Sequence, residues 1–340
     1  MDSVRHRRRF QTGLWLALAV SALASRVTAD EPLTFAPTLS LRTPEAVDQD
    51  DACVWVHPEQ PEKSLIIGSD KAAGRVFVYD LNGSVLQTLQ ISKPGNIDCR
   101  QGVVLNGNKT DLVVVNQRVN PTQLVVLRVD PASLQLQRVD DNCLTGPNYG
   151  GCLYHSRTSG QCYFFCTSEQ GTVAQYELTG DSRGHVKTRP VRELRTGKCE
   201  GAVADDRHQV VYVADEATGV WRFSAEPDAP TEGQLIIRVG EHGLQGDVEG
   251  LAIVPGPENG QLLLVSDQGR SRFRAYRLNE SPTFVGEFAV AGARNTDGID
   301  VVAQPVGPKF PRGLFICHTD QTPRALLVVS WETIARDLWK

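Results

Sequence analysis

After its N-terminus the sequence contains no segment long and apolar enough to cross a membrane, and helical periodicity is almost absent. It has no CxxC pair and no histidine-rich cluster, which argues against a zinc site. The net charge is only −5, so the whole chain does not attract nucleic acid or anionic membranes. No motif for a serine or histidine nucleophile is visible. An anionic ligand would therefore have to be held by local cations, either basic side chains or metal ions.

The N-terminus is typical of a secretory signal peptide. Arginines at positions 5, 7, 8 and 9 precede a short apolar run, Leu14–Ala24, and small residues follow it. Cleavage after Ala29 is one possibility, and cleavage after Ala24 is another. An uncleaved anchor is the rival interpretation, but the run is shorter than the roughly 18 apolar residues of a spanning helix. We predict a signal peptide over residues 1–29, one domain over 30–340, and a secreted or periplasmic protein.

Eight cysteines in an exported chain permit disulfides, but they allow too many pairings for the sequence to assign. Cys53, Cys152, Cys162, Cys166 and Cys317 lie in apolar strands. For these five, burial as small apolar side chains is as good an explanation as a disulfide.

One unit recurs six times, at intervals of about fifty residues. Each copy has an acidic or polar residue, a small residue and an apolar strand, followed by a second apolar run and in most copies a half-buried third one. The six copies begin at Asp51-Ala52, Gln101-Gly102, Gly150-Gly151, Glu200-Gly201, Glu249-Gly250 and Asp297-Gly298.

Short strands in repeats of this length predict an all-β fold, a six-bladed β-propeller with four antiparallel strands in each blade. We expect the segment from Phe35 to Val47 to close the ring by adding a strand to the last blade, which removes an exposed edge. A β-solenoid has shorter repeats, and two β-sandwiches would not give six equal periods.

Acidic residues recur at the predicted strand ends. Within a blade, the start of the first strand and the end of the antiparallel second strand share one rim. The first strands place there Asp50, Asp51, Asp98, Glu200, Asp247, Glu249 and Asp297. The second strands add acidic residues together with Lys71 and Arg118. Crowded carboxylates demand neutralisation, and this many hard oxygen ligands suit calcium. A single Asp-Gly or Glu-Gly is most often only a turn, so the hypothesis depends on their equivalent positions.

The residues resemble the β-propeller phytases, which are calcium-dependent myo-inositol hexakisphosphate phosphohydrolases. The similarity runs from about Asp50 to Trp331. The segments that carry it are Asp50–Pro58, Asn96–Arg100, Tyr149-Gly150, Gln175–Leu178, Glu200–Asp206, Ser224–Asp228, Asp247–Leu251, Ser266–Gly269, Thr296–Asp300 and Gly307–Phe315.

The resemblance implies a role for each matching position. The implied ligands of the active-site calcium ions are Asp50, Glu200, Asp247, Glu249, Gln268 and Asp297. Glu216 matches a carboxylate near the metal-bound water, and Lys71, Arg118 and Tyr149 match phosphate contacts. Asp51 and Asp98 match positions near a structural calcium. The implied reaction is attack of a calcium-bound water on phosphorus, while the metals, Lys71 and Arg118 stabilise the developing charge.

The chain departs from the family pattern at three places. Ala72 follows Lys71 where the family usually has a second lysine, and Glu169-Gln170 stands where it has a Lys-Glu pair. Those family residues help to hold a neighbouring phosphate, so we expect that phosphate to be held less tightly here. The loop from Ala291 to Asn295 is short, and one stabilising calcium is expected to be missing.

The expected partner is a small phosphate ester, phytate or a relative, bound by a monomer that contacts neither nucleic acid nor membrane. Two alternatives stay open. A calcium-dependent lactonase-type propeller would also hold a central calcium but has less need of Lys71 and Arg118. A non-catalytic binding propeller of the cell envelope would explain Ala72 and Glu169 as loss of function. A phosphatase assay with and without calcium separates the three.

Overall fold

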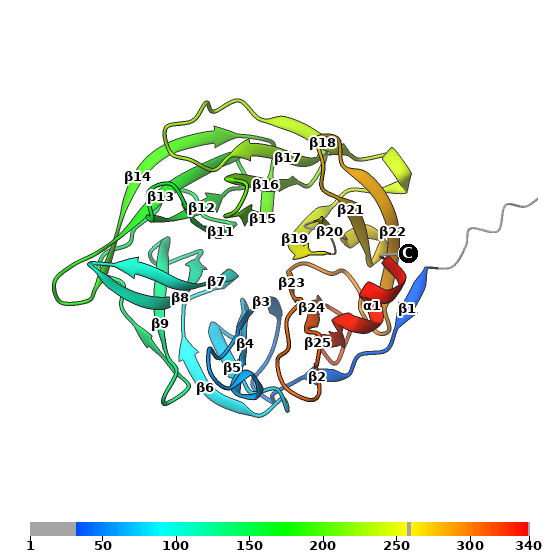
Figure 1. Cartoon of the computed structure of the whole chain (residues 1–340), viewed down its shortest axis with the longest axis horizontal. Helices are drawn as coiled ribbons and strands as arrows, with labels where there is room; N and C mark the ends of the chain where they lie inside the picture. The colour runs from blue at the N-terminus through cyan, green and yellow to red at the C-terminus, as the bar shows by residue number, and fades with distance from the viewer. Residues whose placement is uncertain (1–31, 257–259, 339–340) are drawn as a thin grey trace, which may run out of the picture. The chain divides into compact units, whose positions relative to one another are not determined.

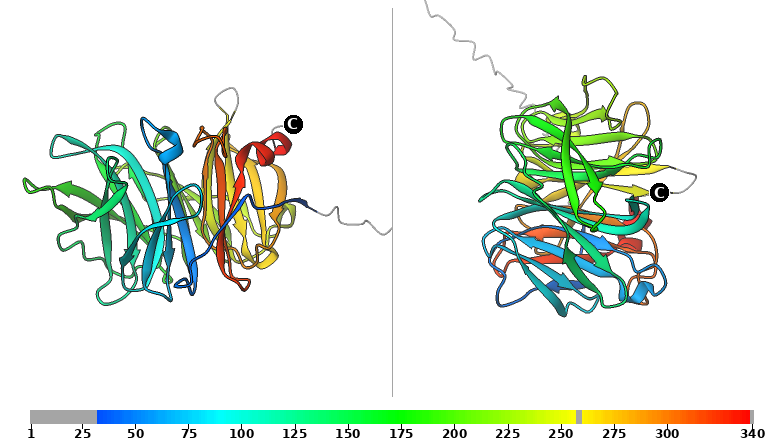
Figure 2. Two further views of the ribbon diagram at one scale, coloured as in Figure 1. Left: turned by 90° about the horizontal axis from the view of Figure 1, so that it is seen from below. Right: turned by 90° about the vertical axis from the view of Figure 1, so that its left-hand side faces the viewer.

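The structure, a computed structural model, describes residues 32–256 and 260–338. Within these ranges the chain folds into six sheets arranged around a central axis (Figure 1). Their strands run through the thickness of the ring from one face to the other (Figure 2). The six-bladed β-propeller predicted from the repeats is therefore confirmed. The predicted signal peptide lies outside the described residues.

The blades follow one another along the chain, and within each the strands are ordered from the centre outwards. Blade 1 contains β3 (Gln49–Trp55), β4 (Leu65–Asp70), β5 (Arg75–Tyr79) and β6 (Val85–Gln90), and blade 2 contains β7 (Pro94–Leu105), β8 (Asn108–Gln117), β9 (Gln123–Asp130) and β10 (Gln135–Arg138). Blade 3 contains β11 (Gly150–His155), β12 (Cys162–Thr167), β13 (Thr172–Gly180) and β14 (Val186–Arg195), and blade 4 contains β15 (Cys199–Asp205), β16 (Val210–Asp215), β17 (Gly219–Ser224) and β18 (Gln234–Arg238). Blade 5 contains β19 (Val248–Pro255), β20 (Gln261–Asp267), β21 (Arg272–Arg277) and β22 (Thr283–Val290), and blade 6 contains β23 (Ile299–Val302), β24 (Leu314–Thr319) and β25 (Ala325–Ser330).

The N-terminal segment closes the ring. Strand β2 (Leu39–Leu41) pairs antiparallel with β25 and becomes the fourth strand of blade 6, as predicted. Strand β1 (Leu33–Phe35), which the sequence did not predict, pairs in parallel with β22 and adds a fifth strand to blade 5. Both pairings cover strand edges that would otherwise be open for pairing with another chain.

The hydrophobic core is divided into six clusters, each shared by two neighbouring blades. Between blades 1 and 2, for example, Trp55 and Ile67 pack with Val113 and Val115, and all four are almost completely buried. The first strands of successive blades also contact one another around the whole channel. Because each cluster needs two blades, the ring is stabilised as a unit, and its inner strands hold the channel-lining side chains in fixed places.

The position of a strand within its blade explains its sequence pattern. The second strand β4 is buried along its whole length and is mostly apolar, whereas most of the outer β6 alternates exposed and half-buried residues. The C-terminal helix α1 (Trp331–Leu338) packs Trp331, Ile334 and Leu338 into the cluster between blades 5 and 6. None of the described helices is long and apolar enough to cross a bilayer.

All eight cysteines belong to the described residues, and each carries a free thiol. Seven are buried, and burial raises the pKa of thiols such as Cys53 and Cys152. The structure therefore favours the interpretation of these residues as small apolar side chains.

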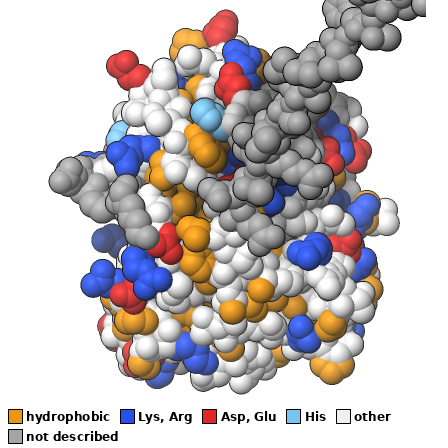
Figure 3. All heavy atoms as spheres, turned by 90° about the vertical axis from the view of Figure 1, so that its right-hand side faces the viewer, with side chains coloured by type: hydrophobic (Ala, Val, Ile, Leu, Met, Phe, Trp, Pro, Cys, Tyr) orange, Lys and Arg blue, Asp and Glu red, His pale blue; other side chains and the backbone are white. Residues whose placement is uncertain are grey.

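Charged side chains of both signs are interspersed on the surface around β1, β22 and α1, where the surface is not covered in the view of Figure 3. Apolar side chains lie among them, some next to one another in a row down the visible surface. On the visible part of this face, no extended basic patch suggests a polyanion-binding surface.

Candidate active site

The first strand of a blade begins at the same mouth of the channel at which the second strand ends. Three blades show this alignment in the pairing of their first two strands: Gln49 pairs with Asp70, Cys199 with Asp215 and Val248 with Asp267. In each, the register shifts immediately afterwards, so the inner strand contains a β-bulge. A bulge redirects the side chains of the extra residues. The bulged segments contain Asp50, Glu200 and Glu249, so the irregularity lies where the candidate ligands are.

The glycine after each of these glutamates is required by the approach of the next inner strand. A Cβ on Gly201 would overlap the backbone of Glu249, and one on Gly250 would overlap the carbonyl of Asp297. The N–H of Gly250 donates to that same carbonyl at 3.1 Å. The Glu-Gly dipeptides are therefore packing positions between blades, which is more than the turn chemistry they most often indicate.

The mouth opens into a cavity of about 730 Å³. Nine of the predicted site residues line it together: Lys71, Arg118, Tyr149, Glu200, Glu216, Asp247, Glu249, Gln268 and Asp297. Asp50 lies at the narrow waist below, where Glu200, Glu249 and Asp297 also reach. Side chains from blades 1 to 6 thus meet around one polar space.

Three buried carboxylates form the most crowded part of the site. Ligand oxygens of Glu200, Glu216 and Glu249 lie within 4.8 Å of one another. Burial raises the pKa of Glu200 to about 7, although Arg118 opposes the shift. Burial and the neighbouring carboxylates raise the pKa of Glu249 well above its usual range. Like charges held this close are costly unless protons or a cation neutralise them.

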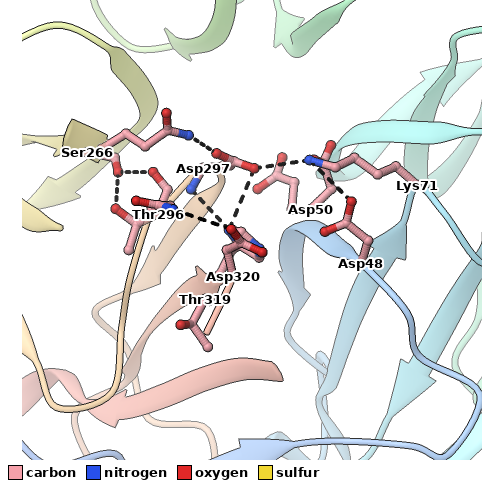
Figure 4. Close-up of polar contacts among 12 residues, drawn as sticks. Asp48, Asp50, Lys71, Ser266, Thr296, Asp297, Thr319 and Asp320 are labelled. Atoms are coloured by element: carbon pink, nitrogen blue, oxygen red, sulfur yellow. Dashed lines mark hydrogen bonds and ion pairs between the residues drawn. The ribbon is translucent and has the colours of Figure 1, made fainter. Parts of the chain in front are cut away.

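Lys71 joins three carboxylates on the blade 1 and blade 6 side of the cavity (Figure 4). Its Nζ lies 2.8 Å from Oδ1 of Asp50, 3.3 Å from Oδ2 of Asp297 and 3.8 Å from Oδ2 of Asp48. Burial of Asp50 acts to raise its pKa, but Arg118 and Lys71 outweigh that effect, and the pKa is lowered. Asp50 is therefore held in its charged form.

Arg118 connects blades 1, 2 and 4. Its guanidinium donates to Asp50 at 3.0 Å and also contacts Glu200, while only 8% of its side chain is exposed. Its Cζ lies 4.7 Å from the centre of the Tyr149 ring, which orients the planar guanidinium over an aromatic face. Burial and the Glu200 carboxylate raise the pKa of Tyr149, so its hydroxyl stays protonated.

The two remaining predicted ligands lie on the blade 5 side. The Gln268 amide donates to Asp297, and Asp247 is exposed at the start of β19. His318 is buried, and its Nδ1 accepts the Asp297 N–H at 3.2 Å. His318 thus positions the backbone of a candidate ligand.

The carboxylate oxygens of this cluster are suitable ligands for a hard cation. Oε1 of Glu216 is buried without a hydrogen-bond partner. The Glu249 carboxyl is buried, and the groups that most affect its pKa besides burial are the neighbouring carboxylates, Glu200 first. Carboxylate oxygens that converge from several blades fit calcium, which takes six to eight oxygen ligands in a flexible geometry.

Asp51 and Asp98 are not part of this cluster. Asp51 lies at the waist, and Asp98 lines a second cavity of about 370 Å³ deeper in the channel. The Asp51 carboxylate accepts the N–H of Ile97 at 3.1 Å, and that of Asp98 accepts the N–H of Leu153 at 2.8 Å. In each case the donor belongs to the next blade, so these carboxylates tie neighbouring inner strands together.

Comparison with known proteins identifies the relatives of this chain. A family model described as phytase matches residues 12–339. A curated 3-phytase of Bacillus subtilis (strain 168) is 33% identical over 355 aligned residues, which cover 96% of this chain and 91% of the relative. The chain belongs to the phytase family. The expectation drawn from the segments around the six repeats is therefore confirmed.

Among solved structures, a calcium-binding protein, regucalcin, from Agrobacterium tumefaciens matches with a TM-score of 0.51 and 9% identity. The match covers 88% of this chain and 96% of the other. At this identity the similarity supports the propeller fold alone.

The departures from the phytase family pattern are visible in the site. Glu169 lines the cavity and is exposed, and Ala72 is exposed beside Lys71. Next to the short loop, Arg324 bridges Asp48 at 3.1 Å and Asp320 at 2.7 Å. A guanidinium therefore joins two carboxylates of blades 1 and 6 close to the place where a stabilising calcium was expected to be missing.

Sequence reasoning missed four charged residues that line this phytase site: Asp48, Lys93, Lys198 and Arg324. Two of them, Asp48 and Lys198, each stand two positions before a predicted ligand, Asp50 or Glu200. Residues two apart in an extended segment point to the same side. The sequence could have indicated these two residues, because they stand two positions before predicted ligands in extended segments.

Proposed function

We propose that this phytase-family protein is a calcium-dependent phosphomonoesterase that releases phosphate from phytate. The observation that carries the proposal is the convergence of buried carboxylates with Lys71 and Arg118 in one cavity. Carboxylates beside cations are what a site for an anionic ester and its metal ions requires.

We propose the calcium ligands by residue. The residues that would hold calcium are Asp50, Glu200, Asp247, Glu249, Gln268 and Asp297. When bound, calcium would neutralise these carboxylates, bind phosphate oxygens and lower the pKa of a water ligand. Support comes from the close approach of the Glu200 and Glu249 carboxylates, whose ligand oxygens lie within 4.8 Å of each other and of Glu216.

Lys71 and Arg118 are proposed to bind the oxygens of the reacting phosphate. Both are held beside carboxylates, so both stay charged, and Arg118 has planar donors suited to two phosphate oxygens. Positive groups fixed near the developing charge stabilise the transition state without reorganisation. Tyr149 is proposed to keep Arg118 in orientation and to offer its hydroxyl to the phosphate.

Glu216 is proposed to take the proton that the attacking water loses. Burial raises its pKa, while the ammonium of Lys198 at 2.7 Å opposes the shift. A carboxylate with a pKa above its ordinary value is a better proton acceptor near neutral pH. As the P–O bond to the alcohol breaks, the proton taken up by Glu216 is returned, directly or through water, to the alcohol oxygen, so that one water is added across that bond and phosphate and alcohol are released.

The proposal treats Asp51 and Asp98 separately. Their carboxylates line the channel and burial raises the pKa of both, which would suit a structural calcium. Such an ion would compete with the N–H groups of Ile97 and Leu153 that these carboxylates accept. Loss of calcium from this place would therefore be tolerated by the fold.

We further propose that the protein is exported and acts as a monomer. The support for export is the sequence of residues 1–29. The free energy of the ring comes from clusters between blades, so no second copy is needed to complete the core. Sedimentation of the purified protein would test the monomer.

The experiment is phosphate release from phytate by the purified mature protein, with calcium and with excess EGTA. Calcium-dependent release supports the proposal. Equal phosphate release with calcium and with EGTA would show that the reaction does not depend on calcium. No release from phytate or from simple monophosphates would instead favour a binding propeller.

A further inference from the structure

Among the described cations that line the cavity, Lys198 differs from Lys71 and Arg118. Lys71 contacts three carboxylates, and Arg118 contacts two with 8% of its side chain exposed. For Lys198 the one observed ion pair is with Glu216, and 47% of its side chain is exposed. Lys198 therefore retains capacity to bind an anion from solution.

The position of Lys198 is fixed from two sides. Its carbonyl accepts the N–H of Glu216 at 3.0 Å, and its Nζ lies 2.7 Å from Oε2 of the same residue. A lysine ammonium has three N–H donors, and the contact with Glu216 uses one of them. The other two can reach an oxygen in the cavity that Lys198 lines.

Tyr149 places Lys198 next to Arg118. The Lys198 Nζ is 5.3 Å from the centre of the Tyr149 ring, and the Arg118 Cζ is 4.7 Å from it. Cations from blade 2 and blade 4 therefore both contact the Tyr149 ring at the cavity. An anionic group bound to either of them would receive charge-assisted hydrogen bonds, which are about twice as strong as neutral ones.

We propose that Lys198 binds a second phosphate group of the substrate while the reacting phosphate lies at Lys71 and Arg118. This inference rests on the proposed function and makes Lys198 a specificity-determining residue. Esters that carry two or more phosphates on one small ring are then favoured over esters that carry one. Glu169, which also lines the cavity, places a negative charge near this position and weakens its hold on an anion.

A purely supporting role for Lys198 makes a different prediction. If it only orients Glu216, its loss would slow hydrolysis of every ester by the same factor, because each reaction uses the same proton acceptor. If it binds a second phosphate, only polyphosphorylated ligands would lose affinity.

The test compares Lys198→Gln with the unmodified protein in two measurements. The first is calorimetric binding of myo-inositol hexakissulfate, a polyanion without phosphate esters, in the presence of calcium. The second is the ratio of kcat/KM for phytate to kcat/KM for 4-nitrophenyl phosphate. We expect hexakissulfate to bind about tenfold more weakly and the kcat/KM ratio to fall about tenfold. Each change corresponds to the loss of one charge-assisted hydrogen bond.

Two further variants serve as controls. Lys187→Gln removes an exposed lysine on the outer strand β14, where it pairs with Asp141, and should change neither measurement. Glu169→Lys, added to Lys198→Gln, should restore most of the lost ratio by returning a cation to the same cavity.

The outcomes separate this inference from the proposed function. Unchanged hexakissulfate binding in Lys198→Gln, or equal losses for both esters, would overturn the role of Lys198 even if the enzyme hydrolyses phytate. If binding weakens as expected but no ester is hydrolysed, the second anion site stands and the proposed catalysis fails.

Discussion

The ammonium nitrogen of Lys71 lies 2.8 Å from Oδ1 of Asp50, whose side chain is only 1% exposed. Lys71 follows β4 and Asp50 lies in β3, so one blade contributes both partners. A proposed phosphate contact is thus paired with a proposed calcium ligand. Burying an unpaired carboxylate is costly. Removal of Lys71 or Asp50 should therefore change both the charge balance of the site and its binding of phosphate and calcium.

The clearest variants for the metal site are Glu249→Gln and Asp297→Asn, which keep shape and remove charge. We expect each to lower phytate kcat/KM by about 100-fold or more, since each removes a proposed ligand of the ion that stabilises the transition state. Phosphate release at saturating calcium measures the loss.

The matched control for these variants is Asp181→Asn, a carboxylate in the exposed turn between β13 and β14. It should leave turnover unchanged. Circular dichroism should show the same β-sheet signal in all three. Normal turnover in Glu249→Gln with an intact fold would exclude Glu249 from the metal site.

Lys71→Met should weaken the interaction of the site with the substrate phosphate. The methionine keeps the apolar stem but removes the three charged donors, so we expect phytate kcat/KM to fall about 10- to 100-fold, which corresponds to one lost charged hydrogen bond. Steady-state kinetics at several calcium concentrations would measure it. An unchanged kcat/KM would mean that Lys71 only neutralises Asp50 and Asp297.

The repeat pattern was sufficient to predict the ring and its polar mouth. Six equal periods fix six blades, and the antiparallel order of the first two strands brings their ends to one rim, so nine of twelve predicted residues line one cavity. Asp50 lies directly beneath. These features depend on local periodicity, which a single sequence contains.

Other features depend on contacts between segments far apart in the chain. The parallel pairing of β1 with β22 involves three residues, Leu33–Phe35, too few to carry a periodic signal. The carboxylate of Asp98, which matches a position near a structural calcium, accepts the N–H of Leu153 in the next blade, a contact that the sequence did not indicate. The sequence around Asp98 does not distinguish a metal ligand from a carboxylate that accepts a hydrogen bond from the next blade.

Arg324→Gln should destabilise the junction of blades 1 and 6. The guanidinium bridges Asp48 and Asp320, and without it the two carboxylates lose their shared cation while Lys71 still contacts Asp48. A half-exposed network of this kind contributes about 1 kcal/mol, so we expect Tm to fall by a few degrees. Differential scanning calorimetry in calcium measures the change.

The control for Arg324→Gln is Arg183→Gln, which breaks an exposed pair with Asp181 on the outside of blade 3. It should leave Tm unchanged. If Arg324 takes the place of a stabilising ion, added calcium should recover part of the Tm lost in Arg324→Gln. Identical Tm values for the two variants would show that the bridge contributes nothing.

Without calcium, stability should fall as pH rises. Burial raises the pKa of Glu200 from 4.5 to about 7, and that of Glu249 is also raised, so between these values the folded state binds protons that the unfolded chain has released. Stability then decreases with increasing pH until the folded carboxyls have ionised. We expect the Tm in EGTA to drop between about pH 5 and pH 8.

Calcium should reverse that trend, because it binds the carboxylates only after their protons leave. The Tm gained on adding calcium should therefore be larger at the upper end of the pH range than at the lower end. Glu249→Gln removes one of the crowded charges, so its Tm in EGTA should depend less on pH than that of the unmodified protein. A calcium-induced gain in Tm that is equal at both ends of the range would contradict the assignment of these carboxylates as the ion's ligands.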